Sequence, residues 1–285
     1  MAKLQVPCSY QGGKSRLASK IVDIFFEENE INDDTHFYDL CCGSGAISIE
    51  LINRGINPLN ITMIDKSPWG LFWQKIGNGE FSTDAFKLYI DDIPKDISKI
   101  KSYVETMAKQ PANDGLFDSL VYKYLILQAA SFGSKAIWVE DNEWKNTSFR
   151  NYWLPTETSK RRSPVNPMMP MPNTLFERVK SIAANMRGVN GIYGDVTDFM
   201  SPKDNSIIYI DPPYEGTTGY GHSFKVQQYI DTLMTNIKLH NKLSKIYVSE
   251  GYQMSDKAHL LSQKRFKGGI SGERKTFNEE WLNIF

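Results

Sequence analysis

The chain has 285 residues, of which 41% are hydrophobic, so it can bury a substantial core, and one catalytic domain with an insertion is the natural organisation. Lys plus Arg and Asp plus Glu both total 33, which leaves a formal net charge of zero, so a nucleic-acid partner would require a locally basic face. Three cysteines and four histidines offer neither a disulfide framework nor metal-ligand spacing, and no signal peptide or membrane-length apolar run is visible, so we expect a cytoplasmic protein that needs no metal and no membrane.

The first recognisable unit is a strand that leads through a glycine loop into a helix. A strand is expected from His36 to Cys42, it runs into Gly43-Ser44-Gly45, and the apolar spacing of residues 46–53 is helical. Glycines at such a turn let the backbone approach a ligand closely, so this unit is typical of a nucleotide-binding loop.

A second strand, residues 61–65, ends in an acidic residue. Asp65 stands about twenty residues after the loop, where a carboxylate usually holds ribose hydroxyls. Ser48 occupies the position of the third glycine in the dinucleotide fingerprint. We therefore expect a cofactor with one nucleoside and no phosphates, and S-adenosylmethionine is the obvious candidate.

After a short helix over residues 66–75, glycines and prolines interrupt the pattern of strands and helices. Residues 116–132 have apolar side chains at helical spacing, so a small, mainly helical lobe is expected from residue 77 to residue 165. Prolines at four positions then predict a stiff return connection: Pro164, Pro167, Pro170 and Pro172.

Residues 144–180 carry the positive charge that the whole chain lacks. They include seven basic residues against two acidic ones, and aromatic side chains stand at the beginning of this stretch. Interleaved cations and aromatic faces suit contacts with the phosphates and bases of DNA. Four basic residues are candidates for these contacts: Arg150, Lys160, Arg161 and Arg162.

The alternation of strands and helices resumes in the last part of the chain. The expected strands are residues 191–194, 207–210 and 245–249, and the expected helices are residues 174–186 and 226–241. With the first two strands, this alternation predicts a three-layer α/β sheet that binds ligands at the carboxyl ends of its strands. Four aspartates stand at or near such ends: Asp39, Asp65, Asp195 and Asp211.

The sequence Asp211-Pro212-Pro213-Tyr214 directly follows the strand at residues 207–210. It places a carboxylate, a rigid main-chain carbonyl and an aromatic face together, which suits chemistry on a planar amine. The carboxylate and the carbonyl can accept the two hydrogens of a nucleobase amino group, which favours its nucleophilic form, while the ring stacks on the base. Asp211, Pro212 and Tyr214 are therefore candidate catalytic residues.

The chain resembles the DNA adenine-N6 methyltransferases of the Dam type through four blocks that occur in the same order. These blocks are Tyr10 to Leu17, which contains Gly-Gly-Lys; Asp39 to Gly45; the pair Gly194-Asp195; and Asp211 to Tyr214. Residues 246–249 and 274–285 resemble two later strands of the family. The resemblance covers the two ends of the chain and leaves out the lobe between them.

This resemblance implies a Rossmann-like class I methyltransferase sheet. Residues 1–76 and 166–285 would form the catalytic domain, and residues 77–165 would form an inserted DNA-recognition lobe. The implied reaction is direct, in-line transfer of a methyl group from S-adenosylmethionine to the amino nitrogen of an adenine that is flipped out of duplex DNA. It requires neither a metal nor an oligomer.

The same resemblance implies roles for single residues. Asp211 and the Pro212 carbonyl would accept the amino hydrogens, and Tyr214 would stack on the base. The residues implied in cofactor binding are Tyr10, Lys14, Asp39, Gly43, Gly45, Asp65, Asp195 and Asp211. Within this set, Asp65 is expected at the ribose and Asp195 at the adenine moiety of the cofactor.

Cys41 departs from the family, which usually has Phe at this position as an aromatic wall of the cofactor pocket. Other interpretations of the site stay open: the same amine chemistry on cytosine, on RNA adenine or on a protein glutamine, or a catalytically silent DNA-binding homologue. Pro7-Cys8 resembles the nucleophile dipeptide of cytosine-5 methyltransferases, but it precedes the cofactor loop instead of following it.

Overall fold

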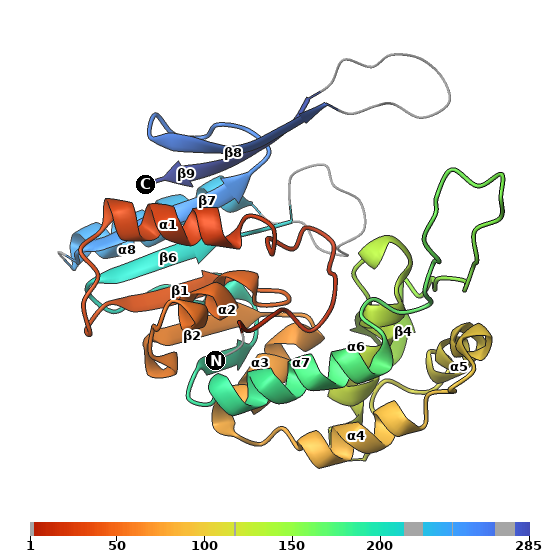
Figure 1. Ribbon diagram of the computed structural model, residues 1–285. Coiled ribbons are helices and arrows are strands. Elements are labelled where there is room, and N and C mark those ends of the chain that lie inside the picture. Colours follow the sequence, from red (N-terminus) through yellow and green to blue (C-terminus); the bar gives the residue numbers. More distant parts are fainter. Residues whose placement is uncertain (1–2, 117, 214–224, 241, 266–276) are drawn as a thin grey trace.

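The computed structural model of the chain describes residues 3–116, 118–213, 225–240, 242–265 and 277–285. These residues form a mixed α/β fold in which eight α-helices accompany a mostly parallel seven-stranded sheet and a separate two-stranded ribbon (Figure 1). The α/β class that the sequence predicts is therefore confirmed.

Five parallel strands form the centre of the sheet. Their bounds are β1 His36–Leu40, β2 Ile61–Asp65, β5 Asn190–Tyr193, β6 Ser206–Ile210 and β7 Ser244–Glu250. Every residue of β1, β2 and β6 is buried, as expected for parallel strands that helices cover on both faces. The complete strand order is β5-β2-β1-β6-β7-β9-β8.

The direction in which the chain crosses the sheet reverses between β1 and β6. From β1 the chain moves outward through β2 to β5, and it then returns to place β6 on the other side of β1, with β7 beyond it. The loops that leave β1 and β6 therefore diverge at the carboxyl edge of the sheet. Such a point is where open α/β sheets bind their ligands.

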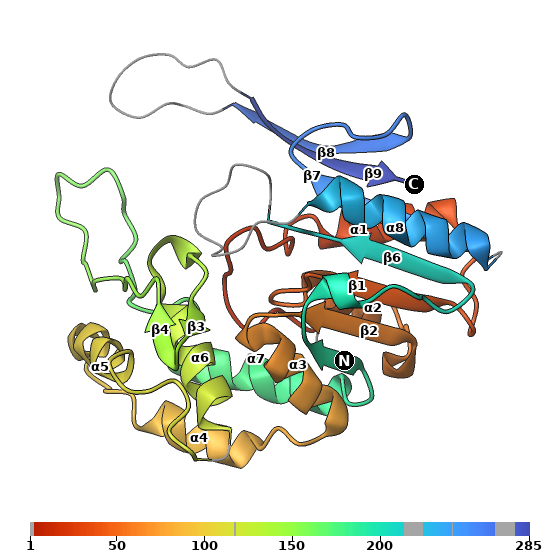
Figure 2. The same cartoon turned by 180° about the vertical axis from the view of Figure 1, so that it is seen from behind.

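Helices cover both faces of the central strands, and Figures 1 and 2 show α1 and α8 on opposite sides. α8 Val226–Leu239 buries an apolar stripe against the face that carries Tyr38 and Leu40. α1 Ala18–Glu28 and α2 Ala46–Asn53 belong to the core on the other face. The sheet is thus the middle layer of three.

Two further helices flank the β5 edge, namely α3 Pro68–Asn78 and α7 Pro172–Asn185. α3 lies so close to β5 that a Cβ atom on Gly191 would come within 2.2 Å of the main-chain carbon of Trp73. Four short 3-10 helices complete the helical segments: η1 Pro58–Asn60, η2 Ile97–Lys99, η3 Phe132–Ser134 and η4 Val196–Asp198.

Residues 77–165 contain short helices and the ribbon. Their elements are α4 Thr83–Asp91, α5 Ile100–Met107, α6 Ser119–Ala130, β3 Trp138–Glu140 and β4 Glu143–Lys145. Nearly all side chains of α6 are buried, and they belong to the same hydrophobic core as α3 and one face of the sheet. Helices outnumber strands in this segment, and its core is continuous with that of the sheet.

A hairpin of β8 Ala258–Arg265 and β9 Phe277–Ile284 closes the sheet. β9 is antiparallel to both of its neighbours, β7 and β8. Because β9 runs against the parallel strands, its first residues lie at the edge where those strands end. This hairpin therefore reaches the same edge as the loops after β1 and β6.

The predicted strands and helices of the sheet are confirmed, with shifts of one to three residues at several ends. β2 and α2 have the predicted bounds, and β9 falls within the stretch that resembles the closing strand, of which residues 274–276 lie outside the described residues. α1 and β8 had no counterpart among the predicted elements. None of the described helices combines the length and the apolar composition that crossing a membrane requires.

Candidate functional site

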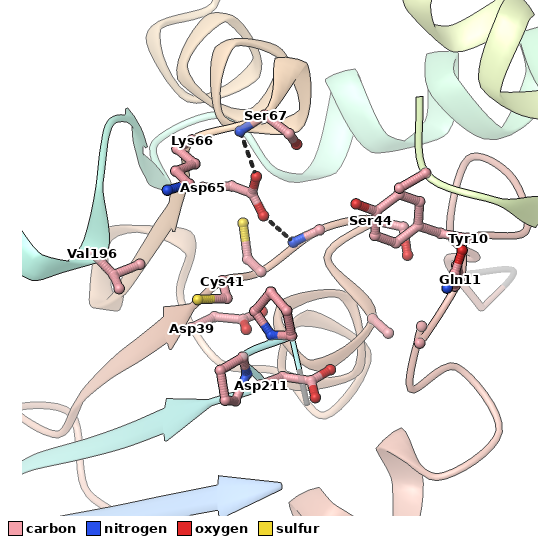
Figure 3. Close-up of a pocket in the computed structure, with 18 of the residues that line it drawn as sticks. Tyr10, Gln11, Asp39, Cys41, Ser44, Asp65, Lys66, Ser67, Val196 and Asp211 are labelled. Atoms are coloured by element: carbon pink, nitrogen blue, oxygen red, sulfur yellow. Dashed lines mark hydrogen bonds between the residues drawn. The ribbon is translucent and has the colours of Figure 1, made fainter. Parts of the chain in front are cut away.

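A cavity of about 310 Å³ lies at the carboxyl edge of the sheet, beside the ends of β1, β2 and β6 (Figure 3). Its volume is at the lower end of the roughly 300–1,000 Å³ that is usual for small-molecule sites. Most candidate cofactor-binding and catalytic residues line it: Tyr10, Lys14, Asp39, Gly43, Asp65, Asp195, Asp211 and Pro212. Gly45 does not belong to the lining, and Tyr214 lies outside the described residues.

The amino-terminal segment forms one wall of the cavity. A turn in which Gly13 N donates to the Tyr10 carbonyl, at 3.1 Å, brings the Tyr10 ring toward the glycine loop. The ring packs edge-on against Trp69, with 5.8 Å between ring centroids. Figure 3 shows Tyr10 and Val196 at opposite ends of the site, with Asp65 and Cys41 between them.

The glycine loop requires glycine for two different reasons. Gly43 has φ +49° and faces the Tyr10 ring, where an added Cβ atom would lie 3.0 Å from Tyr10 Cε1. Gly45 has φ +74° and precedes α2, where an added Cβ atom would lie 2.3 Å from Trp73 Cζ2. Gly43 therefore keeps the cavity wall thin, whereas Gly45 allows the loop to pack on α3.

Asp65, at the end of β2, fixes the loop against the next turn. Its Oδ2 atom accepts from Gly43 N at 2.8 Å, and its Oδ1 atom accepts from Ser67 N at 2.8 Å (Figure 3). Burial raises the pKa of this carboxyl, while the hydrogen bonds from Ser67 and Gly43 oppose that rise. Asp65 lines the cavity, and it also shapes the glycine loop.

Asp39, in β1, binds the helix that follows the loop. Its Oδ2 atom accepts from Ser48 N at 3.2 Å and from Ser48 Oγ at 2.7 Å. Ser48, which replaces the third glycine of the dinucleotide fingerprint, thus ties α2 to β1. Burial raises the pKa of Asp39 to about 7, despite the hydrogen bonds from Ser48.

The raised pKa of Asp39 predicts that stability falls as the pH rises. In the folded chain Asp39 keeps its proton up to about pH 7, whereas the group ordinarily ionises at 3.8. The contribution of this carboxyl to stability is therefore fully present below pH 3.8 and is lost as the pH rises through 7. Asp39→Asn removes this loss, because an amide does not ionise. The change that the substitution makes in the free energy of unfolding should therefore be on the order of 3 kcal/mol more favourable at pH 8 than at pH 4. Urea denaturation at both pH values measures it, with the exposed Asp198→Asn as control. Parallel pH profiles for Asp39→Asn and the unmodified protein would contradict this expectation.

Asp211 lies directly after β6 and is held from two sides. Its main-chain N donates to the Leu40 carbonyl at 3.2 Å, and its Oδ1 atom lies 2.5 Å from Lys14 Nζ. Burial raises the pKa of Asp211 to about 6, and Lys14 limits that rise. Burial by itself lowers the pKa of Lys14, but Asp211 and Glu280 outweigh it and raise that pKa. Above pH 6 the site therefore holds an Asp211 carboxylate beside a Lys14 ammonium.

The lining of the cavity is rich in acidic groups. Four aspartates line it, together with two lysines, Lys14 and Lys66. Asp195 is already engaged, because its Oδ1 atom accepts from Thr197 N at 3.0 Å and its Oδ2 atom from Lys66 Nζ at 3.1 Å. Such a lining favours a ligand that carries positive charge.

Cys41 lies in the lining, where the resemblance would place an aromatic residue. It has φ +60° and packs at the edge of the core under α8. Four aromatic residues line the cavity elsewhere, namely Tyr10, Trp138, Tyr193 and Tyr209, and Tyr193 at the end of β5 is 52% exposed. An aromatic wall can therefore come from positions other than residue 41.

Cys8 is not placed to act as a nucleophile. Its side chain is fully buried outside the cavity lining, and burial raises its pKa to about 12. Catalytic cysteines need an accessible thiolate near neutral pH. This finding argues against the cytosine-5 interpretation of Pro7-Cys8.

The basic residues proposed to contact DNA fall into two groups. Lys160, Arg161 and Arg162 are exposed on the loop that projects from the region of β4, drawn in green at the right of Figure 1. Arg150 is only 9% exposed, and its guanidinium donates to Ser134 Oγ at 3.0 Å. The guanidinium groups of Arg161 and Arg162 donate to main-chain carbonyls of the same loop and stay exposed, whereas Arg150 is integrated into the fold.

Several lining residues were not among the candidates. Residues 136–139 come from the segment before and within β3, and Lys66 follows Asp65 directly. Glu280 contacts Lys14 from β9, with 3.4 Å between Oε1 and Nζ. An acidic residue near the start of the closing strand is a weak signal in the sequence, because only the strand order brings it to Lys14.

A scan against protein-family models gave no match, and a search of curated proteins gave none either. Among the described residues, no group of three or more His, Cys, Asp or Glu side chains is arranged to hold a metal ion.

Proposed function

We propose that the protein is an S-adenosylmethionine-dependent DNA methyltransferase that acts on the exocyclic amino group of an adenine flipped out of duplex DNA. The observation that carries the proposal is that four separate sequence blocks line one cavity. Tyr10 to Lys14, Asp39 to Gly43, Asp195, and Asp211 to Pro212 come from distant parts of the chain. If the four short motifs resembled the family only by chance, nothing would bring them together where the direction of the chain reverses between β1 and β6.

The fold supports the same proposal. A mostly parallel seven-stranded sheet with helices on both faces is compatible with the Rossmann-like sheet of class I methyltransferases. In this interpretation, residues 1–76 and 166–285 form the catalytic domain, and residues 77–165 form the DNA-recognition lobe.

The cavity suits S-adenosylmethionine in charge. This molecule carries a sulfonium and an ammonium, which the aspartates of the lining would attract, and a carboxylate, which the two lysines of the lining, Lys14 and Lys66, would attract. Asp65 would hold the ribose, Asp195 the adenine moiety, and Tyr10 would cover the loop at Gly43. When bound, the cofactor supplies a methyl group on a good leaving group, so the protein has to contribute positioning and electrostatics.

Asp211 and Pro212 would orient the target amine. Lys14 lies against one oxygen of Asp211, which leaves the other oxygen to accept a hydrogen from the adenine amino group. The Pro212 carbonyl would accept the second hydrogen, and Tyr214 would stack on the base. The nitrogen must lose a proton as it gains the methyl group, and the Asp211 carboxylate is the acceptor in contact with that hydrogen.

The exposed loop supports DNA as the partner. Lys160, Arg161 and Arg162 project together, and Trp153 and Leu154 at the base of this loop are 39% and 55% exposed. Cations beside exposed apolar surface suit a duplex, which offers phosphates and base edges together. The neutral net charge of the chain makes such a local basic surface necessary.

The decisive experiment incubates the purified protein with isotopically labelled S-adenosylmethionine and unmethylated duplex DNA. The DNA is then digested to nucleosides, and the labelled base is identified by mass spectrometry. We expect label in N6-methyladenosine. Label in cytosine would mean that cytosine, not adenine, is the methylated base. The absence of label despite cofactor binding would contradict DNA methyl transfer.

The double variant Arg161→Gln and Arg162→Gln should weaken DNA binding and reduce its dependence on salt. Each phosphate contact contributes about 0.9 to the slope of log K against log salt, so the slope should fall by nearly two if both residues contact phosphates. Fluorescence anisotropy with labelled duplex at several salt concentrations measures it. Lys238→Gln, an exposed change on α8, is the control. An unchanged slope would exclude both arginines from the interface.

A further inference from the structure

Glu280 reaches the candidate active site from the closing hairpin, which none of the four sequence blocks includes. On β9, Trp281 pairs with Glu250, the last residue of β7, and Glu280 precedes Trp281. Glu280 therefore stands at the carboxyl edge of the parallel strands. It lies there because β9 is antiparallel and begins where they end.

Lys14 is held by three acceptors, one from each of three chain segments. Its Nζ atom lies 2.5 Å from Asp211 Oδ1, 3.0 Å from the Gly12 carbonyl oxygen and 3.4 Å from Glu280 Oε1. An ammonium has three hydrogens, so each of these acceptors can face one of them. The Lys14 side chain is 6% exposed, and the two carboxylate side chains are each 17% exposed, so water contributes little.

Neither carboxylate would be expected to hold this lysine unaided. A lysine has a flexible four-carbon stem and a compact charge, so a single partner leaves its head free to pivot. With Gly12 and Glu280 on its other sides, the ammonium is confined beside one oxygen of Asp211. One cation between two carboxylates also leaves a net negative charge beside the cavity, which suits a cationic cofactor.

We propose that Glu280 is a positioning residue that acts through Lys14. It confines the Lys14 ammonium to one oxygen of Asp211 and so leaves the other oxygen directed to the amino group of the base. The catalytic meaning of this inference rests on the proposed function. The arrangement of the three side chains does not, so it can be tested separately.

The charges around Asp211 give this arrangement a measurable signature. Asp211 faces Lys14 and Glu280, and Asp39, Cys41 and Tyr209 also lie in its electrostatic environment. Glu280 raises the pKa of Asp211, because a second negative charge disfavours ionisation. Removal of the Glu280 charge should therefore lower the pKa of Asp211 and also lower that of Lys14.

The first test uses the protein without any ligand. Aspartate carboxyl groups labelled with carbon-13 are titrated by NMR, and Asp211→Asn assigns the resonance. We expect a midpoint near pH 6 in the unmodified protein, a lower midpoint in Glu280→Gln, and a return toward pH 6 in Glu280→Asp. Glu279→Gln is the matched control, because Glu279 on the same strand instead accepts from Gln263 and Trp281. A Glu280→Gln midpoint equal to that of the folded unmodified protein would overturn the arrangement.

The second test measures methyl transfer. Glu280→Gln should lower kcat about tenfold, as expected for a misplaced group rather than a lost one, with little change in KM for the cofactor. Both limbs of its rate profile should move to lower pH, Glu280→Asp should restore part of kcat, and Glu279→Gln should resemble the unmodified protein. If kcat stays unchanged although the Asp211 titration shifts, the positioning role is wrong. If the unmodified protein transfers no methyl group, the proposed function fails, and the NMR result still decides the arrangement.

Discussion

Asp211→Asn is expected to reduce the rate of methyl transfer about a thousandfold. A loss of this size is typical when one preorganised electrostatic group is removed from an active site. The amide has the same shape as the carboxylate, but it carries no charge, and its NH2 group would face the hydrogens of the amine. It can neither draw the amino group toward its nucleophilic form nor take the proton that this nitrogen loses. Single-turnover transfer from labelled cofactor to duplex DNA measures the effect.

Binding experiments separate this effect from damage to the site. Asp211→Asn should keep cofactor affinity measurable by calorimetry, because Asp65, Asp195 and Tyr10 remain in the lining. Asp198→Asn, which changes an exposed carboxylate outside the lining, should transfer methyl groups like the unmodified protein. Turnover that survives in Asp211→Asn would remove Asp211 from the mechanism.

The central strands and the cavity loop could be predicted because their signals are local. The strand before Gly43, the helix over residues 46–53 and the strand that ends in Asp65 each appear as one short pattern. Parallel strands buried on both faces are almost continuously apolar, so they stand out from amphipathic helices. The carboxyl ends of such strands meet at one edge, and for that reason the predicted aspartates come together.

The features that were missed depend on contacts between distant segments. α1 begins without a capping side chain, so its start gives no sequence signal. β8 is a polar edge strand that pairs with β9 alone, and polar edge strands lack the apolar signature of central ones. Glu280 acquires its contact with Lys14 only through the antiparallel placement of β9.

Arg150 shows that basic residues close together in the sequence need not lie on one surface. It stands in the basic stretch with Arg161 and Arg162, yet it is 9% exposed while they are exposed. Its main-chain N donates to the Ala130 carbonyl, which draws this part of the chain against the end of α6. Burial lowers the pKa of its guanidinium.

Lys14→Gln should reduce the rate at pH 7 about twofold to a hundredfold, because loss of a neighbouring opposite charge raises a carboxyl pKa by about one to three units. Burial raises the pKa of Asp211. Lys14 is the largest influence that opposes this rise and keeps the pKa at about 6. Without it, Asp211 and Glu280 face each other with no cation between them, so Asp211 keeps its proton at neutral pH. The rate should then recover partly at pH 9, where the carboxylate forms.

Rate profiles from pH 5 to pH 9 at saturating cofactor measure this shift. At saturation, a loss of cofactor affinity no longer affects the rate. Lys14→Arg keeps the positive charge and should leave the acid limb near pH 6. Lys14→Gln and Glu280→Gln therefore move the acid limb in opposite directions, upward for the lost cation and downward for the lost anion. Damage to the fold would lower both rates without moving the limbs apart. An acid limb near pH 6 in all three variants would mean that the ionisation of Asp211 does not control the reaction.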